Sequence, residues 1–226
     1  MRTIYLIRHG KTAGNIEKRY VGSTDEPLCE AGIREINERR EILLRSFLPE
    51  NETDKMSQIK AAHTGDTLPP KVYVSSMLRC RQTAELLFPH ATQEEIPDFR
   101  EMDFGQFEYK NYEELAGDAR YQAFIDSGGQ LDFPDAEPQQ RFRQRVQKAF
   151  LHCLERNEAF MTSMRSDESQ EPLVFVVHGG TIMAIMEAYA RPHKEYFNWQ
   201  VYAACGYRCV LKWEAGSFYL ADVTEI

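Results

Sequence analysis

The sequence predicts an α/β fold of three layers, with helices on both faces of a mainly parallel central sheet and a helical cap insertion. The first observation is that residues 3–7, 71–75 and 173–177 form short apolar runs rich in β-branched and aromatic side chains. Such runs are typical of strands buried on both faces of a parallel sheet. The second observation is that a pattern with helical spacing follows each run, which is the strand–helix alternation of a layered α/β domain.

The remaining elements follow from the same kinds of pattern. Apolar residues recur at helical spacing in four segments, for which we predict helices: 31–47, 79–87, 138–154 and 181–190. Two further strands are predicted at 208–213 and 218–223, joined by a turn at Gly216-Ser217. The polar segment 49–70 carries Gly, Pro, Asp and Thr, and we expect a surface excursion there.

The chain length of 226 residues is that of one α/β domain, so we expect a single domain over residues 1–226. One insertion interrupts it, at about 102–138, where aromatic and acidic residues are frequent. We expect this segment to form a cap over the edge of the sheet. Its aromatic residues either shape a binding site or belong to the core: Phe104, Phe107, Tyr109, Tyr112 and Tyr121.

Composition argues against several classes of protein. The formal net charge is −8, whereas nucleic-acid binders usually carry a basic face, so no nucleic-acid partner is expected. No stretch approaches about 18 apolar residues, so no membrane span is expected. The first residues lack the features of a secretory signal, and a reducing cytoplasm is the expected location. The five cysteines form no C-x-x-C pair and no H-E-x-x-H motif occurs, so neither a disulfide framework nor a metal site is expected.

Charged and imidazole side chains follow the three predicted parallel strands. Arg8 and His9 end the first strand, Arg79 lies just after the second, and His178 and Gly179 follow the third. Ligands of open α/β sheets bind at the carboxyl ends of the strands, so we expect these residues to meet at one edge. Arginine forks and helix amino ends both favour bound anions. The pattern therefore predicts a pocket for a phosphoryl group.

The sequence lacks the motif spacing that three other phosphate-binding or hydrolase mechanisms require. Gly10-Lys11-Thr12 could end a nucleotide-binding P-loop, but the first glycine of that motif would fall on Tyr5. No cysteine is followed by an arginine six residues later, as a cysteine-based phosphatase requires. No G-x-S-x-G elbow occurs either, so a common serine-hydrolase mechanism lacks support.

Five segments resemble motifs of the histidine phosphatase superfamily, whose fold is phosphoglycerate-mutase-like. They are LIRHGKTAGN (6–15), GSTDEPLCEAG (22–32), SSMLRCRQTAELL (75–87), EMDFGQFE (101–108) and VVHGGTI (176–182). They occur in family order, and together they favour the small-phosphatase branch that includes α-ribazole phosphatase and fructose-2,6-bisphosphatase-like proteins. The sequence departs from the family where Ala136-Glu137-Pro138 stands in place of the frequent Gly-Glu-Ser.

The resemblance implies a catalytic role for each matching residue. It implies that His9 is the nucleophile and forms a phosphohistidine, and that Glu101 is the proton donor to the leaving alkoxide. Three further residues would hold the phosphoryl oxygens, with a charged imidazole as one of them: Arg8, Arg79 and His178. Substrate or phosphate contacts are expected from three others: Asn15, the backbone near Thr12, and Gly179.

The function that this resemblance implies is hydrolysis of phosphate monoesters of a small phosphorylated metabolite, without a cofactor or a metal. Positioning and charge stabilisation supply most of the catalysis of phosphoryl transfer, so arginines and imidazoles suffice in principle. Two alternatives stay open. One is a phosphotransferase of the phosphoglycerate mutase type, and the other is a non-catalytic regulatory module that binds phosphate.

Overall fold

The computed structural model describes residues 2–47, 69–156, 170–214 and 216–226. Nearly all of the surface excursion expected at 49–70 lies outside them. The described residues form one six-stranded sheet in the order β3-β2-β4-β1-β5-β6. Its strands have these bounds: β1 Arg2–Arg8, β2 Lys71–Ser75, β3 Thr92–Ile96, β4 Gln170–Val177, β5 Gly206–Glu214 and β6 Ser217–Glu225.

The sheet is mostly parallel, as the sequence predicts. The strands β1 to β4 run in one direction, while β5 pairs antiparallel with β1 and β6 antiparallel with β5. The strand β3 escaped prediction, because its sequence TQEEI is polar and it lies at the edge of the sheet. Polar and charged side chains are common on such edge strands. One of them, Glu94, pairs with Lys71 of β2 at 2.9 Å.

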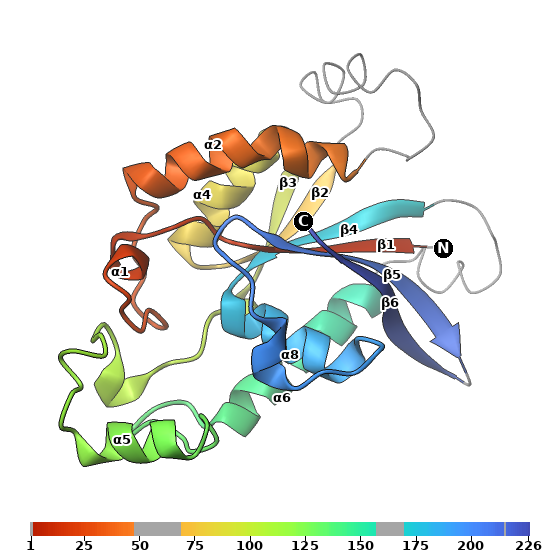
Figure 1. The fold of residues 1–226 in the computed structure, drawn as a ribbon. Helices are drawn as coiled ribbons and strands as arrows, with labels where there is room; N and C mark the ends of the chain where they lie inside the picture. Colours follow the sequence, from red (N-terminus) through yellow and green to blue (C-terminus); the bar gives the residue numbers. More distant parts are fainter. Residues whose placement is uncertain (1, 48–68, 157–169, 215) are drawn as a thin grey trace.

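Helices cover both faces of the sheet (Figure 1). On one face lie α2 (Glu30–Arg45) and α4 (Leu78–Leu87), and on the other lie α6 (Gln139–Glu155) and α8 (Gly179–Tyr189). The shorter helices are α1 (Ala13–Ile16), α5 (Ala119–Asp126), and the 3₁₀ turns η1 (Pro97–Phe99), η2 (Gly105–Phe107) and η3 (Tyr196–Trp199). The predicted three-layer α/β/α fold is therefore confirmed.

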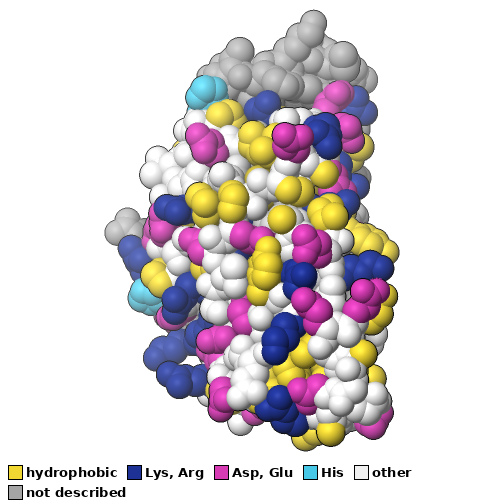
Figure 2. Space-filling model, turned by 90° about the vertical axis from the view of Figure 1, so that its left-hand side faces the viewer, with side chains coloured by type: hydrophobic (Ala, Val, Ile, Leu, Met, Phe, Trp, Pro, Cys, Tyr) yellow, Lys and Arg dark blue, Asp and Glu magenta, His cyan; other side chains and the backbone are white. Residues whose placement is uncertain are grey.

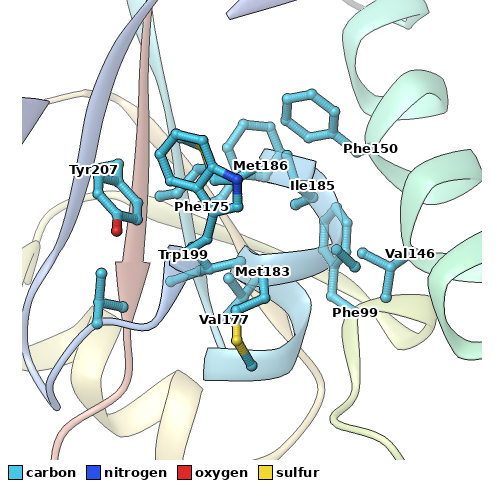
Figure 3. Packing of buried hydrophobic residues seen from close by; sticks show 14 of the residues in the cluster. Phe99, Val146, Phe150, Phe175, Val177, Met183, Ile185, Met186, Trp199 and Tyr207 are labelled. Carbon is cyan, nitrogen blue, oxygen red and sulfur yellow. The ribbon is translucent and has the colours of Figure 1, made fainter. Parts of the chain in front are cut away.

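The core has two parts because β1 buries both of its faces. Its residues Ile4 and Leu6 pack towards α6 and α8, whereas Tyr5 and Ile7 pack towards α2 and α4. Figure 3 shows the first part, in which Phe175 of the neighbouring strand lies among side chains of α6, α8 and η3. This burial of alternate residues on opposite faces accounts for the continuous apolar runs in the sequence.

Residues 102–138 extend from the end of the sheet at which β1 and β4 finish (Figure 1). This segment contains η2 and α5, and turns make up most of the rest. The ring of Phe107 is fully buried and packs edge-to-face against Phe133, whereas Tyr112 is exposed. The aromatic residues of the segment thus divide between the core, the surface and, for Phe104, a cavity.

Basic and acidic side chains are interspersed over the face that Figure 2 shows. This distribution differs from the continuous basic face typical of proteins that bind the nucleic-acid backbone. Within the described part of the chain, no helix is both long enough and apolar enough to cross a membrane.

Candidate active site

The ends of β1 and β4 bring the two histidines of the predicted site together. The strands are parallel neighbours with Arg8 opposite Val177, and the next amide, that of His9, donates to the Val177 carbonyl at 3.0 Å. The ring centroids of His9 and His178 are 5.0 Å apart. Because β2 lies on the other side of β4, the helix that follows it delivers Arg79 to the same place.

His9 is buried and its imidazole has a defined tautomer. Nδ1 lies 2.7 Å from the carbonyl oxygen of Gly10, which can only accept, so Nδ1 carries the proton and donates it. The lone pair is therefore on Nε2. Burial lowers the pKa of His9 well below its usual value, and the charges of Arg79 and Arg8 lower it further. The result is a neutral imidazole with a nucleophilic Nε2.

Arg79 is completely buried, and backbone carbonyls surround its guanidinium. Nη1 donates to the carbonyl of Thr24 at 2.8 Å, while Nη2 donates to the carbonyls of Gly22 at 3.0 Å and Val21 at 3.4 Å. Nε donates to Nδ1 of His178 at 3.3 Å. A guanidinium has five N–H groups, so one N–H on Nη1 is left for a ligand. Arg79 therefore acts on the site mainly through its charge.

His178 is neutral, and the expectation of a charged imidazole is wrong for this structure. Its Nδ1 faces the Nε–H of Arg79 and must accept, so its proton is on Nε2, which donates to the hydroxyl of Ser75 at 2.8 Å. Burial lowers the pKa of His178 well below its usual value, and the charges of Arg79 and Arg8 act in the same direction. The buried imidazole thus orients Arg79 through one nitrogen and is held by Ser75 through the other.

Arg8 has more free donors than Arg79. Nη1 donates to the carbonyl of Val201 at 2.8 Å, while the buried Nε has no hydrogen-bond partner among the described residues. The guanidinium lies beside Gly179, where an added Cβ would be 3.4 Å from Cζ. A buried donor without a partner is destabilising, and an anion placed against it removes that penalty.

Glu101 reaches the amino end of α8 from the loop after η1. Its Oε2 accepts from the amide of Gly180 at 2.9 Å, and its Oε1 accepts from its neighbour Met102 at 3.0 Å. A Cβ on Gly180 would collide with this carboxyl, so the approach requires glycine. Arg145 holds the backbone here, because its Nη2 donates to the Glu101 carbonyl at 3.1 Å while its fork pairs with Glu137.

The three expected contact residues behave differently. Gly179 lines the cavity described below, next to Arg8. Thr12 and Asn15 instead form a capping box at the start of α1, in which each side chain accepts from the backbone amide of the other. Thr12 is fully buried, and neither residue lines the cavity. In this structure both residues position the loop after His9 rather than a ligand.

A cavity of about 490 Å³ adjoins the cluster. Of the predicted site residues, Arg8, Glu101 and Gly179 line it, while His9, Arg79 and His178 are buried and are not among its lining residues. No group of three or more His, Cys, Asp or Glu side chains in the described ranges is arranged to hold a metal ion. The arrangement combines a neutral imidazole, two guanidinium charges and a carboxyl group at a helix amino end.

A family profile settles the classification. The profile of the histidine phosphatase superfamily (branch 1) matches residues 4–48 and 54–225. The chain belongs to the histidine phosphatase superfamily. The match includes the two strand ends, Arg79 and Glu101, and it confirms the resemblance that the motifs indicate.

Curated relatives within the superfamily carry two kinds of name. The chain is 27% identical over 158 residues to the probable phosphoglycerate mutase GpmB of Enterobacter sp. (strain 638), across 68% of this chain and 64% of that protein. It thus spans a little under two thirds of the length of such relatives. It is 25% identical over 209 residues to the adenosylcobalamin/α-ribazole phosphatase of Salmonella typhimurium, covering 89% and 87% of the two chains.

Solved structures of the superfamily share the fold. A putative α-ribazole-5′-P phosphatase from Escherichia coli superposes with a TM-score of 0.70 at 21% identity, covering 97% of this chain and 94% of that one. A mycobacterial glucosyl-3-phosphoglycerate phosphatase, solved with VO₃, gives a TM-score of 0.73 at 18% identity, with 97% and 96% covered.

Glu108 is a site-forming residue that the sequence reasoning missed, although it ends the superfamily-like segment 101–108. Its carboxylate accepts from the amides of Gly22 and Thr24, both at 2.9 Å, and from that of Phe104 at 3.3 Å. The carbonyls of Gly22 and Thr24 in turn accept from Arg79. Glu108 therefore holds the loop that surrounds the buried guanidinium.

Thr83 is a second residue of this kind, and it joins α4 to the loop after β1. Its hydroxyl accepts from the amide of Gly10 at 3.0 Å and donates to the carbonyl of Arg79 at 2.7 Å. This single hydroxyl fixes the distance between the segments that carry His9 and Arg79.

The pKa of His9 gives the first prediction. Because burial and two arginines lower this pKa, the ring stays neutral at pH values at which an ordinary imidazole is already protonated, and it takes up a proton only at more acidic pH. NMR shifts of the imidazole carbons and nitrogens measure this. The His9 signals are those missing from the spectrum of His9→Gln, and they should report an Nδ1–H tautomer throughout this pH range. A His9 signal that titrates at or above the ordinary value of about 6.5 would contradict the burial argument.

The contacts of Glu108 give the second prediction. In Glu108→Gln the charge is lost and an amide N–H group must face a backbone N–H, so the loop loosens around Arg79. We expect the Kd for inorganic phosphate, measured by calorimetry, to rise roughly tenfold, which corresponds to about 1.4 kcal/mol. The matched control is Glu113→Gln, an exposed carboxylate of the same segment that accepts from Tyr112. Equal affinities for both variants would show that the loop does not depend on Glu108.

Proposed function

We propose that the chain is a phosphatase that hydrolyses phosphate monoesters of a small metabolite through a phosphohistidine on His9, with Glu101 as the proton donor. The observation that carries the proposal is the state of His9. Its Nδ1–H is bound to the Gly10 carbonyl and its pKa is lowered, so Nε2 carries a lone pair. Nearby, the buried Nε of Arg8 has no hydrogen-bond partner in the part of the chain that the structure describes.

The first step moves the phosphoryl group to the enzyme. Nε2 of His9 attacks phosphorus, the bond from phosphorus to the ester oxygen breaks, and the departing oxygen takes a proton from the carboxyl of Glu101. In the second step, water attacks phosphorus while Glu101 takes its proton, the nitrogen–phosphorus bond breaks, and phosphate leaves. Dividing the reaction in this way replaces one difficult displacement by two easier ones.

The two arginines have different tasks in this scheme. Arg8 has unoccupied donors next to Gly179, so it can bind the equatorial oxygens directly. Arg79 supplies charge and one N–H from a fully buried position. Preorganised charges in such a site stabilise the developing negative charge without reorganising during the reaction.

The names of the relatives support a phosphatase, and some also favour a second candidate. Several relatives are named probable phosphoglycerate mutases, so a phosphotransferase that returns the group to a second hydroxyl is the alternative. Both activities would use the phosphohistidine, and they differ in whether water or the product alcohol accepts the group. A non-catalytic phosphate-binding module is the remaining alternative.

Loss of the nucleophile tests the proposal. We expect His9→Ala to lose at least about a thousandfold in turnover of 4-nitrophenyl phosphate while keeping the wild-type thermal unfolding midpoint within a few degrees. His193→Ala, an exposed histidine, is the control. Undiminished turnover by His9→Ala would refute the mechanism, and a wild-type chain inactive on a broad panel of phosphate esters would favour the binding module. A coupled assay that shows interconversion of the two monophosphoglycerates would favour the mutase.

The proton-donor role of Glu101 has its own signature. Alkoxides need a proton when they leave, whereas 4-nitrophenolate does not, so Glu101→Gln should slow the two classes unequally. We expect the variant to lose about 10²-fold or more in kcat/KM on an alkyl phosphate, and clearly less on 4-nitrophenyl phosphate. Equal losses on both substrates would show that Glu101 acts by positioning rather than by proton transfer.

A further inference from the structure

Aromatic rings form a large part of the wall of the cavity beside Arg8 and Glu101. Six of them come from different helices and loops of the chain: Tyr20, Phe104, Phe124, Phe133, Phe142 and Tyr196. Of these, Phe124 lies on α5, Phe142 on α6 and Tyr196 on η3. Side chains with large flat apolar surfaces are suited to bind rings or extended apolar groups.

The rings hold one another in place. Phe133 is at the centre, with its ring centroid 4.4 Å from Phe124, 5.3 Å from Phe104 and 5.4 Å from Tyr20. Tyr20 and Phe104 are themselves 5.2 Å apart. These separations lie in the range of favourable aromatic pairs. The wall is therefore preformed, so a ligand need not order it.

Two exposed aromatic side chains extend this wall to the solvent. Phe197 is 40% exposed and Tyr202 is 81% exposed, and both line the same cavity. Single exposed apolar residues are ordinary on protein surfaces. These two are continuous with a buried aromatic wall, which makes them the outer part of one apolar surface.

Charge is scarce in the described lining of this cavity. Besides Arg8, its one cation is Arg143, whose guanidinium lies 3.2 Å from a carboxylate oxygen of Glu187 and 4.2 Å from the ring centre of Tyr196. Its charge is thus already compensated. Gln139 is also engaged, because its amide donates to the carbonyls of Gly129 and Leu131. Among the described lining residues, no uncompensated cation besides Arg8 is available to bind a second anionic group of a substrate.

A second cavity, of about 370 Å³, lies on another side of Glu101 and has mixed charge. Arg100 and Arg141 line it together with Asp103 and Asp135. The acidic side chains offset the basic ones, so this space also lacks the net positive charge that a second phosphate or a carboxylate would need.

We propose that the site selects phosphate monoesters whose alcohol carries an aromatic or extended apolar group, and disfavours esters with a second anionic group. This inference rests on the proposed phosphatase activity. The phosphoryl group lies at His9 and Arg8, and the alcohol extends over the aromatic wall towards Phe197 and Tyr202. Burial of a ring there stabilises both the substrate complex and the transition state, and it raises kcat/KM.

The test compares esters of primary alcohols, so that the demand on the proton donor is similar. We expect kcat/KM to rise about tenfold or more from ethyl phosphate to 2-phenylethyl phosphate, and to rise again for 2-(1-naphthyl)ethyl phosphate. The ester 3-phosphoglycerate, which carries a carboxylate, should be hydrolysed no faster than ethyl phosphate. Equal values across the apolar series, or a preference for 3-phosphoglycerate, would overturn the inference.

Variants connect the selectivity to the wall. Phe104→Ala and Phe197→Ala should each lower the ratio of kcat/KM for 2-phenylethyl phosphate to that for ethyl phosphate by about threefold or more, whereas Tyr112→Ala, exposed and outside the cavity, should not. An unchanged ratio in both wall variants would overturn the inference while leaving the phosphatase proposal intact. Absence of turnover with every ester would overturn the phosphatase proposal itself, and the inference with it.

Discussion

The buried guanidinium of Arg79 is the group on which the rest of the site depends. It has no carboxylate partner among the described residues, and three backbone carbonyls and one imidazole nitrogen surround it instead. Neutral ligands compensate a buried cation only partly, so the pocket keeps a positive potential. Burial lowers the pKa of His9 and of His178, and this potential lowers both further. The same positive potential favours a bound phosphoryl dianion, so it contributes both to the neutral state of His9 and to the affinity for anions.

Two different environments, one polar and one aromatic, meet at Arg8 and Glu101. One is the polar, buried cluster, which is built on the ends of the central strands and is held by hydrogen bonds to backbone carbonyls and to the hydroxyl of Ser75. The other is the aromatic cavity, to which the segment 102–138 contributes much of the wall. In the proposed reaction, the sheet sets the geometry of the reacting group, while the more irregular segment sets the shape around the alcohol. Changes in that segment can alter selectivity without moving His9.

The strands that carry the cluster could be predicted, because each one is marked by a pattern within a short stretch of sequence. Apolar runs mark β1, β2 and β4, and the topology of a parallel sheet then brings Arg8, His9 and His178 to one edge. The strand β3 could not be predicted, because an exposed edge strand has no apolar pattern. Contacts between distant segments are also invisible in sequence: the protonation of His178 is decided by which nitrogen faces Arg79, and Asn15 is occupied by the cap of α1.

The central claim is that Nε2 of His9 becomes the phosphoryl acceptor because every other feature of that imidazole is fixed by the fold. Rapid mixing of Glu101→Gln with 4-nitrophenyl phosphate should form the covalent intermediate readily, since the leaving group needs no proton, and hydrolyse it slowly. Quenching in alkali, which preserves phosphohistidine, followed by proteolysis and tandem mass spectrometry locates the group. The account predicts a phosphoryl group on His9 and none in the same variant carrying His9→Ala. A phosphoryl group on any other side chain, or release of 4-nitrophenolate without a phosphorylated protein, would contradict it.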